Sequence, residues 1–213
     1  MEIKDCLSYL KLLVNPADGV SLKRILNQPP RGIGDASLEK VQEYSWTKGQ
    51  TLYQAMTEVE QITGLQDRAK KQIRLFVDVI EKLRLSVETS TASQTLTDTI
   101  IDTGYLAYWE KETTTEAKMR LENVKELVSS AREFEERRED KSLKAYLDMV
   151  QLATSMDKED NREGVTLMTL HNAKGREYPV VFITGLEEGR FPHKNSVDEE
   201  GGIHLNLLQC RPL

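Results

Sequence analysis

The chain of 213 residues carries a formal net charge of −6, with 38% hydrophobic and 30% charged residues, which is the composition of a soluble globular protein. No apolar run approaches the ~20 residues of a membrane span, and the first residues lack the apolar region of a secretory signal, so we expect neither a transmembrane segment nor export. Cys6 and Cys210 are too few for a disulfide framework or a zinc site, and we expect a cytoplasmic protein.

Hydrophobic periodicity predicts helices through most of the chain. The first covers residues 2–14 and stops at Asn15-Pro16, and a short helix at 20–27 follows it. Beyond a non-helical stretch, a third helix begins with Asp35 or Ser37 as its N-terminal cap. The remaining predicted helices cover about 51–60, 66–87, 95–102, 115–139 and 142–154.

The non-helical stretch Pro29-Pro30-Arg31-Gly32-Ile33-Gly34 lies between two of these helices. A helix, a Gly-Ile-Gly turn and a second helix form the outline of a helix-hairpin-helix, in which glycine amides can approach a phosphate. Between residues 22 and 50 the positive side chains outnumber the negative ones. Two interpretations remain open from these residues: a contact with duplex DNA, or an ordinary packing corner between two helices.

The pattern changes near residue 160. The β-branched, apolar runs 165–170 and 180–184 predict two strands, buried on both faces as in a parallel sheet. The loop between them carries a histidine, a lysine, a glycine and a glutamate at the carboxyl end of the first strand, where ligands bind in α/β sheets. We therefore predict a mainly α protein with a small α/β piece.

The order of residues in this loop, Thr169-Leu-His171-x-x-Lys174-Gly175-x-Glu177-Tyr-Pro, resembles motif V of superfamily-1 DNA helicases, closest to the UvrD/PcrA/Rep group. The segments Glu2–Asp18, Pro30–Asp35 and Gly185–His193 also resemble that group, in the same order along the chain. The resemblance covers roughly residues 2–200, and each motif predicts a structural context that can be checked.

This resemblance implies a domain organisation. Residues 15–160 correspond to the helical domain 2B with its helix-hairpin-helix-like turn, and residues 1–14 form an edge of the RecA-like domain 2A. Residues 161–200 form a second segment of domain 2A and carry motif V. Residues 201–213 are an atypical tail, because the family pattern there leads toward motif VI and its arginine.

The resemblance also implies roles for single residues. Thr169 and His171 are expected to bind the backbone of single-stranded DNA, because neutral donors let a strand slip between steps. Glu177 is expected to accept a hydrogen bond from the nucleotide ribose, and Gly175 to lie beside the terminal phosphate, where a side chain would clash. Lys174 either senses that phosphate or lies in solvent.

For the turn, the resemblance and the local positive charge together favour DNA. We expect contact with duplex DNA, without sequence preference, through five residues: Arg31, Gly32, Ile33, Gly34 and Lys40. Since only about two or three phosphates would be contacted, binding is expected to be weak and salt-dependent.

The chain lacks the G-x-x-x-x-G-K-[ST] loop that holds nucleotide phosphates, so we expect no catalytic residue, no metal site and no ATP hydrolysis by the chain alone.

The favoured interpretation is a C-terminal part of an ATP-dependent 3′–5′ DNA helicase that uses ATP with Mg²⁺. Its partners would be single-stranded and duplex DNA, the remaining helicase domains, and repair or replication proteins, with no membrane. The alternatives are a stand-alone, non-enzymatic DNA-binding or regulatory module, and a helical protein-interaction domain.

Overall fold

A computed structural model describes residues 1–156, 165, 167–168, 173 and 177–184. The chain divides into two compact units, Met1–Asp160 and Asn161–Leu213, and each is described by itself. All regular secondary structure among the described residues is helical. This confirms the mainly α fold class, while the assignment of residues 1–14, 15–160 and 161–200 to helicase domains stays a prediction.

The helices of the first unit follow the predicted order, and their ends differ from the predicted ones by a few residues. They are α1 (Glu2–Val14), α2 (Gly19–Ile25), α3 (Asp35–Lys48), α4 (Leu52–Thr57), the 3₁₀ helix η1 (Val59–Gln61), α5 (Asp67–Ser86), α6 (Ala92–Asp102), α7 (Tyr105–Glu110), α8 (Thr115–Arg137) and α9 (Leu143–Met156). The short α7 has no counterpart among the predictions, because six residues are too few to show a helical period.

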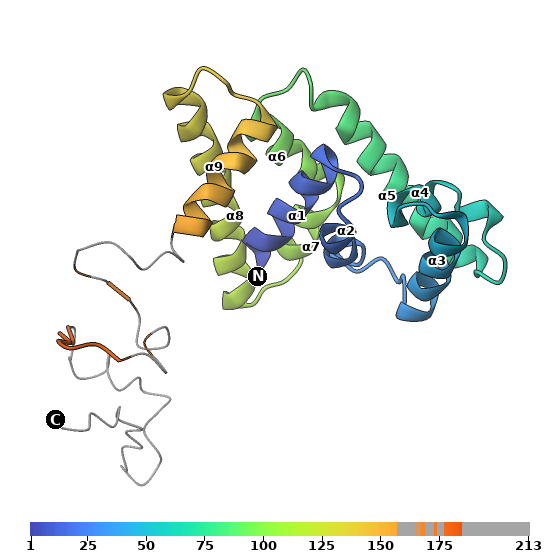
Figure 1. Ribbon diagram of the computed structural model, residues 1–213, viewed down its shortest axis with the longest axis horizontal. Helices are drawn as coiled ribbons and strands as arrows, with labels where there is room; N and C mark the ends of the chain where they lie inside the picture. Colours follow the sequence, from blue (N-terminus) through green and yellow to red (C-terminus); the bar gives the residue numbers. More distant parts are fainter. Residues whose placement is uncertain (157–164, 166, 169–172, 174–176, 185–213) are drawn as a thin grey trace, which may run out of the picture. The chain divides into compact units, whose positions relative to one another are not determined.

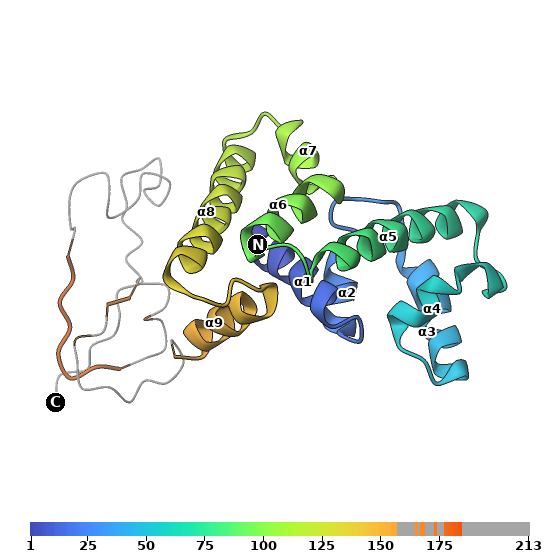
Figure 2. The same ribbon diagram turned by 90° about the horizontal axis from the view of Figure 1, so that it is seen from above.

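Helix α1 is the central element of this unit. It contacts α2, α5, α6, α8 and α9, and Figures 1 and 2 show it enclosed by these helices. Its side chains Cys6, Tyr9, Leu10 and Leu13 are at most 3% exposed. Complete burial of one such large apolar side chain stabilises the fold by about 1.5–3 kcal/mol, so α1 anchors the hydrophobic core.

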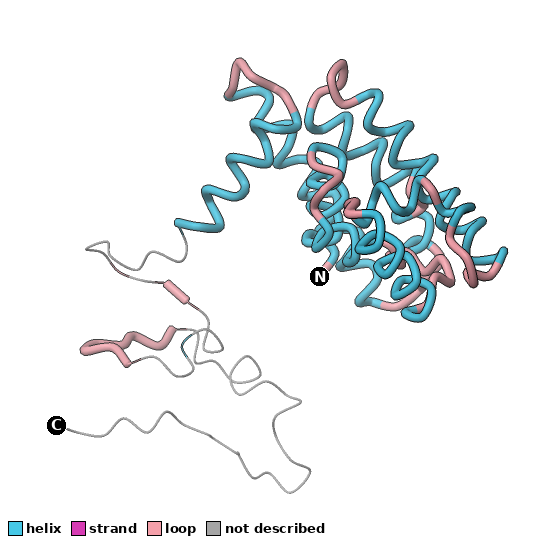
Figure 3. The backbone as a smooth tube through the Cα atoms, turned by 45° about the vertical axis from the view of Figure 1, so that its right-hand side comes forward, coloured by secondary structure: helices cyan, strands magenta, loops and turns pink. Residues whose placement is uncertain are grey.

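Helices α3 and α4 lie with the first turns of α5 on the side of the unit away from α8 and α9 (Figures 1 and 2). Figure 3 shows the helices of the unit and the loops that join them. Helix α4 contacts both α3 and α5. The 20 residues of α5 give it a length of about 30 Å, and its C-terminal half reaches α1 and α6. One long helix therefore joins the predicted DNA-contact turn to the core around α1.

The predicted caps of α3 are wrong. Gly34 is the N-cap residue, no side chain accepts a hydrogen bond from the first turn, and Asp35 is the first helical residue. An acidic residue is favoured at that position by the positive end of the helix dipole rather than as a cap. The first amides of α3 therefore have no side-chain acceptor.

The predicted buried strands are not confirmed. Residues 165, 167–168 and 180–184 carry no strand in the described part of the chain. Val165, Leu167 and Phe182 are 88%, 92% and 85% exposed. A strand satisfies its backbone only by pairing with another strand, and the described residues supply no such neighbour. The α/β piece of a RecA-like domain stays a prediction.

Candidate nucleic-acid interface

The turn between α2 and α3 presents two exposed glycines on either side of a buried anchor. Gly32 has φ +72°, a left-handed conformation that favours glycine. Ile33 is 4% exposed and fixes the turn to the core. Gly34 is extended, with φ −78° and ψ 164°, and a Cβ atom added there would meet no atom within 4 Å. The outer surface of the turn is therefore open to a ligand.

Arg31 belongs to the predicted duplex contact, yet its side chain turns back onto the protein. Its Nη1 donates to the carbonyl oxygens of Ile25 and Leu26, each at 3.0 Å, and lies 3.3 Å from that of Pro29. The last carbonyls of a helix have no partner within the helix. The guanidinium of Arg31 therefore pairs the C-terminal end of α2.

The guanidinium of Arg31 also contacts residues of α1, α5 and the C-terminal end of α6. Nη2 donates to Tyr9 Oη of α1 at 2.7 Å and to the carbonyl oxygen of Thr103, after α6, at 3.2 Å. The guanidinium carbon lies 5.1 Å from the centre of the Phe76 ring of α5. Burial raises the pKa of the Tyr9 phenol, which remains protonated at neutral pH. Both Nη atoms of Arg31 are thus committed to internal acceptors.

Lys40 lies in the second turn of α3, and its side chain is exposed. Its Nζ donates to the carbonyl oxygen of Gly64, in the loop before α5. An ammonium group carries three donors, so this contact leaves Lys40 able to meet a phosphate at the same surface. The structure thus places Lys40 between the predicted turn and a second loop.

Arg68 is a cation near the turn that the sequence pattern did not indicate. It lies in the first turn of α5, is exposed, and has no hydrogen-bond or ion-pair partner among the described residues. Its Nη2 lies 3.8 Å from the position that a Cβ atom on Gly32 would occupy. A signal existed in the sequence, because Gly64-Leu-Gln-Asp67 before Arg68 is similar to Gly32-Ile-Gly-Asp35.

Most residues of the predicted nucleotide and single-strand sites, Thr169, His171, Lys174 and Gly175, lie outside the described residues. Glu177 is described and exposed.

No group of three or more potential metal ligands occurs within the described part of the chain. None of the described helices has the length and apolar character to cross a bilayer.

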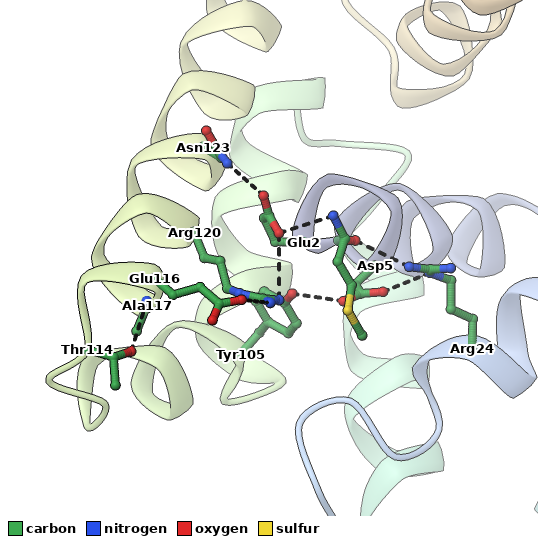
Figure 4. A network of polar contacts seen from close by, with 10 residues as sticks. Glu2, Asp5, Arg24, Tyr105, Thr114, Glu116, Ala117, Arg120 and Asn123 are labelled. Carbon is green, nitrogen blue, oxygen red and sulfur yellow. Dashed lines mark hydrogen bonds and ion pairs between the residues drawn. The ribbon is translucent and has the colours of Figure 1, made fainter. Parts of the chain in front are cut away.

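A buried polar cluster on α1, shown in Figure 4, stabilises the unit away from the turn. Asp5 is 1% exposed. Its Oδ1 accepts a hydrogen bond of 2.7 Å from Arg24 Nε of α2, and its Oδ2 accepts one of 3.0 Å from Tyr105 Oη of α7. Burial raises the pKa of the Tyr105 phenol, so this hydroxyl stays a donor. The carboxylate thus joins three helices.

Glu2 forms the second half of this cluster (Figure 4). Its Oε1 accepts a hydrogen bond of 2.6 Å from Asn123 Nδ2 of α8, and Arg120 lies 3.8 Å from its Oε2. Burial tends to raise the pKa of the Glu2 carboxyl, but hydrogen bonds from its own backbone and from Asn123 outweigh burial and hold its pKa below the usual range. Arg120 also stacks on Trp109, 4.7 Å from the ring centre. The contacts with Glu2 join α8 to α1, and the contact with Trp109 joins α8 to α7.

Comparison with known proteins gives a consistent result. Residues 1–204 match the family described as the UvrD-like helicase C-terminal domain. The chain is 42% identical over 207 residues to the ATP-dependent DNA helicase PcrA of Bacillus subtilis (strain 168), covering 93% of this chain and 28% of that protein. It is 39% identical over 202 residues to the PcrA helicase of Staphylococcus aureus (strain MRSA252), covering 94% and 28%. The chain thus spans somewhat more than a quarter of the length of these relatives.

Proposed function

This chain belongs to the UvrD-like helicase C-terminal domain family, and we propose that it supplies the duplex-contact surface and one wall of the nucleotide site of an ATP-dependent DNA helicase. The relatives are named as ATP-dependent DNA helicases. Such a motor needs a phosphate-binding loop and Mg²⁺ carboxylates, which the other helicase domains would provide. The proposed direction of movement is 3′–5′ along single-stranded DNA.

The observation that carries the duplex role is the open Gly32–Gly34 turn. Both glycines are exposed, Gly34 has free space around it, and no side chain caps the helix that starts there. Backbone N–H groups at a helix N-terminus favour an anion through both their hydrogen bonds and the helix dipole. A sugar-phosphate backbone meets these groups without reading sequence.

The second part of the proposal concerns the loop around residues 169–177. Thr169 and His171 would donate hydrogen bonds to single-stranded DNA, and Glu177 would accept one from the ribose of ATP. Gly175 would lie close to the terminal phosphate, with Lys174 beside it. The exposure of Glu177 supports this role, because a carboxylate must be accessible to meet a ligand.

The duplex role can be tested with Gly34→Val. Valine tolerates the extended conformation of Gly34, and its Cβ meets no protein atom, so the fold is expected to persist. The side chain would stand where a phosphate approaches. We expect roughly tenfold weaker binding to a tailed duplex, and little change with single-stranded DNA, as measured by fluorescence anisotropy over a salt titration.

Gly19→Val is the matched control for this variant. Gly19 also lies at the start of a helix, and a Cβ atom there is equally unhindered. Wild type and the control are expected to share a salt slope of roughly −2 to −3, the value for two or three phosphate contacts. Equal duplex affinity of Gly34→Val and wild type, with both proteins folded by circular dichroism, would show that the turn is only a packing corner.

The chain alone is expected to release no phosphate from ATP above background, even with saturating single-stranded DNA. Its sequence lacks the loop that binds the β- and γ-phosphates. The measurement is steady-state phosphate release by the purified chain, with Glu177→Ala as the companion variant. Turnover that is present in wild type and lost in Glu177→Ala would contradict the prediction, because a contaminating enzyme would not respond to this change.

A further inference from the structure

Within the described residues, the turn before α3 has a counterpart before α5. Gly32-Ile-Gly-Asp35 before α3 corresponds to Gly64-Leu-Gln-Asp67 before α5. The two leading glycines have φ +72° and +74°. The residue after each glycine is buried, Ile33 at 4% and Leu65 at 7% exposure. Each aspartate is the first residue of its helix, and the N-cap before it is extended and makes no side-chain hydrogen bond.

The correspondence continues into the flanking helices. Val41 of α3 and Ile73 of α5 stand at the same distance after the two leading glycines, and both are 0% exposed. A short α-helix precedes each turn: α2 in the first copy, and α4 followed by the 3₁₀ helix η1 in the second. Residues 19–86 therefore contain two copies of one supersecondary unit, helix–turn–helix, placed one after the other.

The two copies contact each other reciprocally. Lys40, from the helix of the first copy, donates to the carbonyl oxygen of Gly64 in the turn of the second. Arg68, from the helix of the second copy, places Nη2 next to Gly32 in the turn of the first. Each turn therefore has a cation of the other copy beside it.

The cations at the first turn differ in what they can still bind. Arg31 directs both Nη groups to internal oxygen atoms. Arg68 is exposed and has no such partner among the described residues. Asp35 and Asp67 place carboxylates at the starts of α3 and α5, which disfavours a phosphate unless a positive charge offsets them. Arg68 is positioned to supply that charge, as Lys40 is between the two turns.

We propose that Arg68, contributed by the second copy, is the cation that contacts a backbone phosphate of duplex DNA seated on the Gly32–Gly34 turn. The inference rests on the proposed duplex role of that turn and adds a residue 36 positions further along the chain. A guanidinium suits this task because its planar N–H groups match two phosphate oxygens at once. The internal repeat explains how a residue so distant in sequence reaches the site.

The test uses the full chain with Arg68→Gln, which removes the charge from an exposed side chain and leaves the fold intact. Arg132→Gln is the matched control, because Arg132 is also exposed and lies on α8, on the side of the unit away from α3 and α5. We expect Arg68→Gln to weaken tailed-duplex binding roughly fivefold and to make the salt slope shallower by about one. Arg68→Lys is expected to restore most of the affinity, and Arg132→Gln to behave as wild type.

The outcomes separate this inference from the role on which it depends. If Gly34→Val weakens duplex binding and Arg68→Gln does not, the assignment of Arg68 is wrong and the role of the turn stands. An equal loss in Arg68→Gln and Arg132→Gln would also overturn it, since net charge rather than position would then be responsible. A wild-type chain that does not bind the duplex at all would overturn both proposals. A loss specific to Arg68→Gln, with recovery in Arg68→Lys, supports it.

Discussion

Replacement of Arg31 by alanine is expected to lower the free energy of unfolding of the helical unit by roughly 3 kcal/mol. The change removes the Nη donors that pair the carbonyl oxygens of Leu26 and Thr103, while the carbonyl oxygen of Ile25 keeps the backbone N–H of Gln28 as a donor at 3.0 Å. A buried acceptor left without a partner costs about 1–3 kcal/mol. The variant also loses the stacking of the guanidinium on Phe76.

The measurement for Arg31→Ala is urea denaturation followed by circular dichroism, and Arg68→Ala is its matched control. Both variants replace an arginine within the same helix–turn–helix region, but Arg68 has no internal acceptor among the described residues. A surface substitution of that kind changes stability by at most about 0.5 kcal/mol. If Arg31→Ala unfolds at the wild-type urea concentration, the internal role of this side chain is wrong.

Replacement of Asp5 by alanine is expected to have an effect of similar size, again on the order of 3 kcal/mol. Asp5 is 1% exposed and accepts hydrogen bonds from Arg24 and Tyr105. Its removal leaves the Tyr105 hydroxyl buried without its acceptor and the Arg24 guanidinium without its anion. Most of the cost comes from the Tyr105 hydroxyl, which is 1% exposed and keeps its desolvation penalty, because the Arg24 side chain is 35% exposed and can turn to water.

A double-mutant cycle with Tyr105→Phe tests this prediction. Because both changes remove the same hydrogen bond, the double variant is expected to lose less stability than the two single variants together. Asp102→Ala is the control, since Asp102 pairs with Lys82, whose side chain is 70% exposed. Exposed ion pairs contribute about 0–1 kcal/mol. Additive losses for Asp5 and Tyr105 would mean that the two groups do not interact in solution.

The sequence was sufficient to predict the helices, because helical periodicity is a local property. The apolar stripe of α5, with Ile73, Phe76, Ile80 and Leu83, predicts a long helix. The pair Asn15-Pro16 predicts the end of α1. Family membership was likewise accessible, because the resemblance rests on short motifs in a fixed order, and the match over residues 1–204 confirms it.

The predicted strands show where local pattern stops being sufficient. The runs 165–170 and 180–184 have the composition of buried strands, yet all of their described residues except Met168 are exposed, and none of the described ones lies in a strand. Helical hydrogen bonds form within one segment, whereas a strand depends on a partner segment. The periodicity of a segment indicates its preference for helix or strand. It does not indicate whether a second strand lies beside that segment.

At the candidate site, the sequence determined the Gly-Ile-Gly turn but not which arginine is exposed beside it. Arg31 adjoins the turn in sequence, but its acceptors on Tyr9 and Thr103 lie 22 and 72 residues away along the chain. Arg68 is remote in sequence, but the packing of two similar helix–turn–helix copies brings it to Gly32. A cation pairs with the oxygen atoms that the fold brings nearest to it. The local sequence therefore identified the turn. Only the tertiary structure distinguished Arg31, whose side chain bonds internally, from Arg68, whose side chain is exposed.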